Sequence, residues 1–307
     1  MTQPQIRVAA SIAHSDISTS IVLSGSRAPQ VSAKGIDLTA HLNVPFARRP
    51  NRSLLLDLLV PPGSGPKPLI VYITGGGFIR AEKENGRLLR TCLAVAGFAV
   101  ASIQYLTVWE GATYLDGVAS VREAVAFLRS NAATYDLDPT RVALLGESAG
   151  GYLATMAGLD PANAVRAVVN KFGIVDFGSI TEDFDSKTQA SQTGPDLPLA
   201  LYLHGEGTGR TVHDPIPDAS PLNHITPSSP PFQLWHGLAD GIISPSQTLR
   251  LHTALRSAGV DSTRYVLPGA GHGDVAILLG DPEGALPWYT EEVIGLTTDF
   301  FRTHLLS

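Results

Sequence analysis

A serine flanked by glycines stands where a short apolar run gives way to a helical pattern. The segment reads Gly146-Glu147-Ser148-Ala149-Gly150 and follows the run RVALL. Glycines on both sides of a serine permit the sharp strand-to-helix turn that exposes a nucleophilic hydroxyl. The N-terminus of the following helix also favours negative charge that develops nearby. A plain helix N-cap has the same letters, but the position between a strand and a helix favours a nucleophile at Ser148.

A serine hydroxyl is a weak nucleophile unless a neighbouring base takes its proton. Two later segments, each following a strand-like run, supply a carboxylate and an imidazole: HGLAD ends at Asp240, and GAGHG contains His272. We therefore predict Ser148 as nucleophile, His272 as base and Asp240 as the acid that orients the base. Asp274 is the rival acid near the histidine, but at two residues' distance it does not easily reach the far ring nitrogen.

Three other residues that could do chemistry are interpreted as structural. His252 lies within a helical pattern and is expected to be a surface or core residue. His236 ends a strand and is expected to pack beneath the site. Cys92, the single cysteine, lies in an apolar stretch and is expected to be a packed helix residue rather than a reactive thiol.

A run of three glycines follows an earlier strand. The segment TGGGF, residues 74–78, comes directly after LIVYI. Consecutive glycines lose much conformational entropy on folding, so an unused run there is costly. We expect the run to bring backbone N–H groups close to a substrate oxygen, with Gly76, Gly77 and Ala149 forming an oxyanion hole. The alternative is a flexible turn that leaves the strand.

The elements that must position these groups alternate in type from residue 68 onward. Before that point, residues 36–42 and 53–60 are typical of antiparallel edge strands. Apolar runs then alternate with helical patterns; the runs are LIVYIT, FAVASI, RVALLG, VRAVVN and FQLWHG, and the helices span about 86–96, 115–133, 148–157 and 246–258. Strands that are apolar on both faces and separated by helices predict a mostly parallel central sheet with helices on both faces.

One stretch breaks this alternation. Residues 176–225 are rich in Gly, Pro, Ser, Thr and Asp and show no strong periodicity, apart from a short apolar piece near residues 197–203. Their position before the acid-bearing segment suits a lid or substrate loop, and a disordered surface insertion is the alternative. No repeat or linker is visible, so residues 1–307 are expected to form a single domain.

Composition narrows the class of protein. The chain has 307 residues, of which 44% are hydrophobic and 16% charged, as in globular proteins. A net charge of -6 without a cluster of Lys or Arg argues against nucleic acid as a partner. One cysteine excludes an intramolecular disulfide and a multi-cysteine metal site, and we expect no metal or organic cofactor. No apolar run approaches a membrane span, and the first residues are not a convincing signal peptide, so we predict a soluble cytoplasmic protein.

Taken together, these motifs resemble the α/β-hydrolase superfamily, in the group of carboxylesterases, hormone-sensitive-lipase-like and feruloyl-esterase-like enzymes. The resemblance runs from about residue 53 to the C-terminus and includes LDPTRVALLGESAGG, SPLNHITPSSPPFQLWHGLAD and LPGAGHG. The chain order serine, acid, histidine is also that of this superfamily. The resemblance implies the α/β-hydrolase fold and cleavage of a small carboxylic ester through an acyl-enzyme. It does not specify the substrate.

Short-chain acyl or aromatic esters are the expected substrates, because no extended apolar lid for long lipids is visible. Trp109, Phe78, Phe184 and the apolar piece near Leu201 are candidate pocket residues, although core packing explains each one singly. An amidase such as an arylformamidase, or a transacylase, would use the same three residues. A non-catalytic binding protein on this fold usually lacks one of them.

The chain departs from the pattern of the group at two positions. Thr74 stands where a histidine usually precedes the three glycines, and Glu147 stands where many relatives carry aspartate. In relatives the histidine helps to brace the oxyanion loop. We therefore expect the Thr74 hydroxyl to bond a neighbouring backbone group and to provide a smaller brace.

Overall fold

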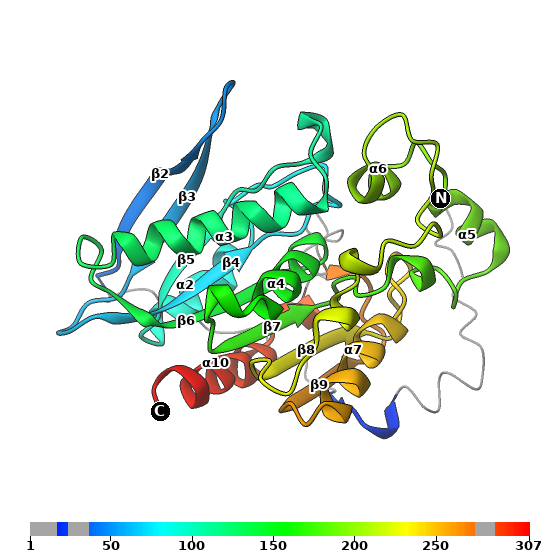
Figure 1. The fold of residues 1–307 in the computed structure, drawn as a ribbon. Coiled ribbons are helices and arrows are strands. Elements are labelled where there is room, and N and C mark those ends of the chain that lie inside the picture. The colour runs from blue at the N-terminus through cyan, green and yellow to red at the C-terminus, as the bar shows by residue number, and fades with distance from the viewer. Residues whose placement is uncertain (1–16, 24–36, 274–285) are drawn as a thin grey trace.

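A single sheet organises the chain. The computed structural model describes residues 17–23, 37–273 and 286–307. Within these residues, nine strands form one sheet, in which they lie in the order β1-β9-β8-β7-β6-β4-β5-β3-β2 (Figure 1). The strands are β1 (Ile21–Val22), β2 (Thr39–Arg48), β3 (Ser53–Val60), β4 (Lys67–Ile73), β5 (Ala99–Ile103), β6 (Leu137–Glu147), β7 (Ala167–Lys171), β8 (Phe232–Gly237) and β9 (Ser262–Leu267). β3 runs antiparallel to β2 and β5, and the other neighbours are parallel.

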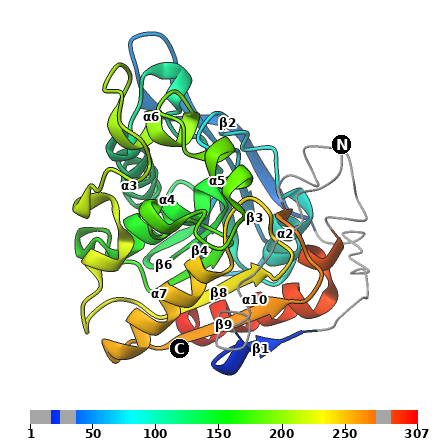
Figure 2. The same cartoon turned by 90° about the vertical axis from the view of Figure 1, so that its right-hand side faces the viewer.

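Helices cover both faces of this sheet (Figure 2). The longer ones are α2 (Arg87–Val95), α3 (Tyr114–Ser130), α4 (Ala149–Leu159), α7 (Ser246–Ser257) and α10 (Glu291–Leu305). Buried residues of α3, α4 and α7 join one hydrophobic cluster, and those of α2 and α10 join the other. Within the described part of the chain, no helix has both the length and the apolar character needed to cross a membrane.

Strand β4 shows why the middle of a central strand is apolar on both faces. All of its residues are buried. Leu69, Val71 and Ile73 pack into the cluster on one face, and Ile70 and Tyr72 pack into the cluster on the other. Because successive side chains point to opposite faces, the part of the strand that is covered on both sides is apolar at successive positions. The predicted mostly parallel sheet with helices on both faces is therefore confirmed.

The structure also contains elements that the sequence interpretation did not assign. They include the short edge strand β1, the helix α10 near the C-terminus, and two α-helices within residues 176–225, α5 (Ser186–Gln192) and α6 (Pro198–His204). The strand β1 has only two residues, and each of the two helices in residues 176–225 has only seven. Elements this short carry little periodic signal.

The parallel strands place the motifs together. Ser148 follows β6, the glycine loop (residues 74–78) follows β4, the segment with Asp240 follows β8, and the segment with His272 follows β9. Carboxyl ends of parallel strands meet at one edge of a sheet, where ligands of open α/β sheets usually bind. The fold thus gathers segments that are far apart in the sequence.

Candidate active site

Ser148 occupies a sharp turn between β6 and α4. Its φ of 53° and ψ of −121° are rare for a residue with a side chain. The turn is held by the backbone N–H of Ser148, which donates to the carbonyl of Lys171 at 2.9 Å. A side chain on Gly150 would overlap the carbonyl oxygens of Ile73 and Thr74. The glycine therefore lets the first turn of α4 lie directly against the end of β4 and the start of the glycine loop.

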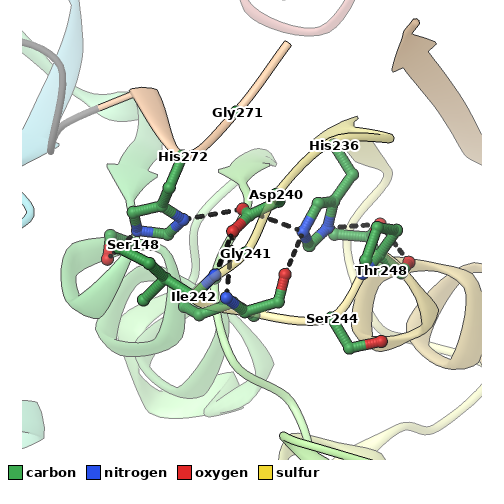
Figure 3. Close-up of polar contacts among 12 residues, drawn as sticks. Ser148, His236, Asp240, Gly241, Ile242, Ser244, Thr248, Gly271 and His272 are labelled. Carbon is green, nitrogen blue, oxygen red and sulfur yellow. Dashed lines mark hydrogen bonds and ion pairs between the residues drawn. The ribbon is translucent and has the colours of Figure 1, made fainter. Parts of the chain in front are cut away.

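The structure brings together the three residues predicted to react. The Ser148 hydroxyl lies 2.8 Å from Nε2 of His272, and Nδ1 of His272 lies 2.7 Å from Oδ2 of Asp240 (Figure 3). All three residues are buried. The imidazole also meets the Phe172 ring edge-on, with centroids 4.9 Å apart. This packing limits rotation of the ring and keeps both nitrogens directed at their partners. The rival acid Asp274 lies outside the described residues.

Asp240 is a fully buried carboxylate with a donor at each oxygen. Oδ1 accepts from the backbone N–H groups of Ile242 and Ile243 at 2.9 and 3.0 Å, and Oδ2 accepts from His272. Burial by itself would raise the pKa of Asp240. The charge of His272 and hydrogen bonds from His236 and His272 oppose it and hold that pKa well below its ordinary value. Asp240 is therefore ionised at neutral pH.

The glycine loop contains backbone N–H groups that no backbone carbonyl of the described residues accepts. Gly76, Gly77 and Phe78 have φ values of 134°, 60° and 62°, so the chain turns through three successive residues in the positive-φ region. A side chain on Gly76 would overlap the Arg80 carbonyl. Among the described residues, no backbone carbonyl accepts a hydrogen bond from the N–H groups of Gly76, Gly77 or Ala149. These donors are available to an oxygen atom of a ligand.

The brace of the glycine loop differs from the sequence expectation. The Thr74 side chain is buried, but its hydroxyl makes no hydrogen bond within the described part of the chain, and its carbonyl is the group that is held. The Tyr105 hydroxyl lies 3.2 Å from the carbonyl oxygen of Thr74 and 3.0 Å from that of Arg80. The expected hydrogen bond of the Thr74 hydroxyl is therefore not found among the described residues, and the Tyr105 hydroxyl contacts the loop carbonyls instead.

A buried ion pair lies beneath the serine. The Glu147 carboxylate accepts from Nζ of Lys171 at 2.7 Å and from the Tyr72 hydroxyl at 2.7 Å. Burial, followed by the charge of Glu147, raises the pKa of Tyr72 well above its ordinary value, so this hydroxyl stays a donor. Because Lys171 also accepts the Ser148 N–H through its carbonyl, the pair ties β4, β6 and β7 together directly below the turn.

The segment 176–225, called the insert below, packs against the glycine loop. Tyr202 of α6 stacks on Phe78, with ring centroids 4.2 Å apart and an interplanar angle of 16°. Its hydroxyl donates to the carbonyl of Leu106 at 3.3 Å, and α3 leaves room for it at Gly117, where a side chain would overlap. Tyr152 of α4 meets Phe78 edge-on. The insert therefore holds the ring of a positive-φ residue in the loop.

The structure also places the candidate pocket residues and the residues that were expected to have structural roles. Phe78 and Phe184 are buried and Leu201 is partly buried, whereas Trp109 is 70% exposed. Two expectations of structural roles agree with the structure. His252 is buried and bonds Ser262. Cys92 is buried in α2, and burial raises the pKa of its thiol to about 11, which makes it unreactive at neutral pH.

Sequence reasoning missed Tyr105, Lys171 and Tyr202. Tyr105 and Tyr202 contact residues that are far away in the sequence, and a local sequence pattern does not indicate such contacts. Lys171 left a weak signal, since a lysine follows the apolar run Ala167–Val169 after one intervening asparagine. A charge at the end of a buried strand requires a partner, and Glu147, at the end of the neighbouring strand, carries the opposite charge.

Comparison with known proteins assigns this chain to a family. The BD-FAE family model matches residues 56–255, which is more than half of the chain. The chain belongs to the BD-FAE family. The match contains the glycine loop, Ser148 and Asp240, whereas His272 lies beyond it. The predicted resemblance to the α/β-hydrolase esterases is confirmed.

Two curated relatives are named as esterases. Esterase LipC of Mycobacterium tuberculosis (strain ATCC 25618 / H37Rv) is 29% identical over 226 residues, covering 68% of this chain and 53% of LipC. Esterase LipQ of the same organism is 27% identical over 240 residues, covering 72% and 54%. The chain thus spans about half the length of these curated relatives. A truncated carbohydrate esterase from gut microbiota superposes with a TM-score of 0.75 at 23% identity, covering 92% of this chain and all of that one, which confirms the α/β-hydrolase fold.

Proposed function

We propose that this chain is a serine hydrolase that cleaves carboxylic esters, with Ser148 as nucleophile, His272 as base and Asp240 as the orienting acid. The observation that carries the proposal is the continuous hydrogen-bonded chain from the Ser148 hydroxyl through the imidazole to a buried, ionised carboxylate. The membership of the BD-FAE family and the esterases among its relatives support the same reaction.

The first half of the reaction forms an acyl-enzyme. His272 takes the hydroxyl proton on Nε2 while Ser148 Oγ attacks the ester carbonyl. Asp240 keeps Nδ1 protonated and stabilises the imidazolium without accepting the proton. The carbonyl oxygen becomes an oxyanion, and the N–H groups of Gly76, Gly77 and Ala149 are the donors proposed to meet it. One such donor is worth about 2.7–4 kcal/mol in the transition state.

The second half releases the acid. The imidazolium returns its proton to the leaving alcohol as the carbon–oxygen bond breaks. Water then loses a proton to His272 and attacks the acyl carbonyl through the same oxyanion position. The second tetrahedral intermediate expels Ser148 Oγ, which regains its proton from the imidazolium. The products are one alcohol and one carboxylic acid, and the protein ends unchanged.

The proposed substrates are short-chain acyl or aromatic esters that enter beside the insert. The insert touches both loops of the site, because Tyr202 stacks on Phe78 and Gln192 Nε2 lies 3.4 Å from the Gly241 carbonyl. Buried aromatic rings join Phe78 to the insert and to α4. Space filled by these rings is not available to a long acyl chain, which supports a small substrate.

Replacing Ser148 by alanine tests the proposal. We expect Ser148→Ala to abolish covalent labelling by a fluorophosphonate and to lower kcat for p-nitrophenyl esters by about 10⁴ to 10⁶. Ser102→Ala is a matched control, because Ser102, on β5, is also buried but bonds the carbonyl of Lys83 instead. It should label and turn over like the wild type.

The same panel separates ester from amide cleavage. Matched p-nitrophenyl esters and p-nitroanilides of the same acids differ only in the leaving group, so their kcat/KM ratio reports the preference directly. Normal turnover in Ser148→Ala, or labelling that maps to another residue, would remove the proposed nucleophile.

A further inference from the structure

A second histidine is enclosed behind the acid. His236, near the end of β8, is fully buried. Its Nε2 lies 3.1 Å from the carbonyl oxygen of Ile243 and 3.3 Å from Oδ2 of Asp240, and its Nδ1 lies 3.0 Å from Oγ1 of Thr248 (Figure 3). Oδ2 is also the oxygen that accepts from His272. Two imidazoles therefore meet one carboxylate oxygen from opposite sides.

The hydrogen-bond partners of the two ring nitrogens of His236 indicate which nitrogen carries a proton. A carbonyl oxygen only accepts, so Nε2, which faces Ile243, carries hydrogen. Thr248 Oγ1 accepts the Nε–H of Arg264 at 3.0 Å and can give its own proton to His236 Nδ1 at 3.0 Å; the other acceptor in reach, the Pro245 carbonyl, is at 3.4 Å. The N–H at Nε2 is thereby placed between the Ile243 carbonyl and Oδ2 of Asp240.

We propose that His236 is a positioning residue that holds Asp240 toward His272. This inference rests on the proposed function. Backbone N–H groups of Ile242 and Ile243 hold Oδ1 of the acid. Nε2 of His236, which bonds the Ile243 carbonyl, also lies 3.3 Å from Oδ2, the oxygen that accepts from His272. Rotation of the carboxylate away from His272 would break the bonds to Oδ1 and the contact with His236, and would leave buried donors unpaired.

The same contact affects the basicity of His272. Among the described residues, the charged groups that face His236 are Asp240, in contact, and Arg264, through the Thr248 hydroxyl. A donor on Asp240 withdraws part of the negative charge that would otherwise stabilise the imidazolium of His272. Removing the donor should therefore raise the apparent pKa on the acid side of the kcat/KM profile, by about 0.5 to 1 pH unit.

The test compares three variants. His236→Leu removes the donor, and His236→Gln keeps an N–H near the position of Nε2. His252→Leu is the matched control, because His252 is buried but bonds Ser262, away from Asp240. The readouts are the rate constant for fluorophosphonate labelling of Ser148, kcat and KM for one p-nitrophenyl ester, and kcat/KM from pH 5 to 9. The amount of labelled protein gives the number of active sites.

We expect His236→Leu to lower kcat and the labelling rate about tenfold per active site, with KM within twofold and the acid-side pKa raised. His236→Gln should recover most of the loss, and His252→Leu should lose none of it. An unchanged rate and pH profile in His236→Leu, or an equal loss in His252→Leu, overturns the positioning role. If the wild-type protein is labelled at Ser148 but does not hydrolyse esters, the proposed function is wrong. The role of His236 is still tested in that case, because the labelling rates of the variants can be compared.

Discussion

The Tyr105 hydroxyl should contribute to catalysis although it lies outside the reacting groups. It stands within hydrogen-bonding distance of the carbonyls of Thr74 and Arg80, on either side of the glycine loop. Tyr105→Phe removes this hydroxyl and leaves the ring in place. The N–H groups of Gly76 and Gly77 then lose part of the restraint that aims them at the developing oxyanion.

The structure limits how large the effect is. A hydroxyl has one proton, so Tyr105 donates one neutral hydrogen bond at a time, worth about 0.5–1.5 kcal/mol. If the whole free energy of this hydrogen bond is lost from the transition state, kcat falls about two- to twelvefold. The upper limit is the loss of a whole oxyanion donor, about 2.7–4 kcal/mol. KM should stay within twofold, because the oxyanion hole acts on the transition state more than on the bound ester.

Thr74→Val is the matched comparison. Its hydroxyl has no hydrogen-bond partner among the described residues, and valine has nearly the same shape, so kcat should change less than about twofold. Steady-state kinetics with a p-nitrophenyl ester, normalised by fluorophosphonate titration, measure both variants, and thermal unfolding reports any loss of stability. A tenfold loss in Thr74→Val together with wild-type kinetics in Tyr105→Phe would refute the reasoning and restore the threonine as the brace.

Two further predictions follow from the site. Tyr202→Leu removes the ring that stacks on Phe78 and should lower kcat about two- to twelvefold, the worth of an aromatic pair, while Tyr202→Phe keeps the stack and should stay within twofold; equal losses in both would show that the hydroxyl matters instead. The folded pKa of Asp240 lies below that of an unfolded aspartate, so its contribution to stability is complete above about pH 4 and is lost as pH falls toward the folded pKa. Tm between pH 6 and 3 should therefore fall less in Asp240→Asn than in the wild type, and parallel falls would contradict this linkage.

Local patterns were sufficient for the central strands and for the three residues of the hydrogen-bonded chain. The apolar run SLLLDLLV coincides with β3, and FQLWHG with β8. Ser148, Asp240 and His272 each follow a strand in a short glycine-containing segment, and parallel strands deliver such segments to one edge. The sequence therefore determined which chemical groups meet, because strand direction and chain order already specify their common location.

Only the tertiary structure decided what holds those groups in place. The Tyr105 hydroxyl reaches a carbonyl 31 residues away, and Tyr202 lies in the insert, where the sequence shows little periodicity. Thr74 looked like the local substitute for the usual histidine, yet its hydroxyl is not the brace. Supporting contacts depend on which side chains fill the space around a loop, and many residues far away in the chain compete for that space. The packing of the folded chain determines which side chains occupy that space, and the local sequence pattern does not contain this information.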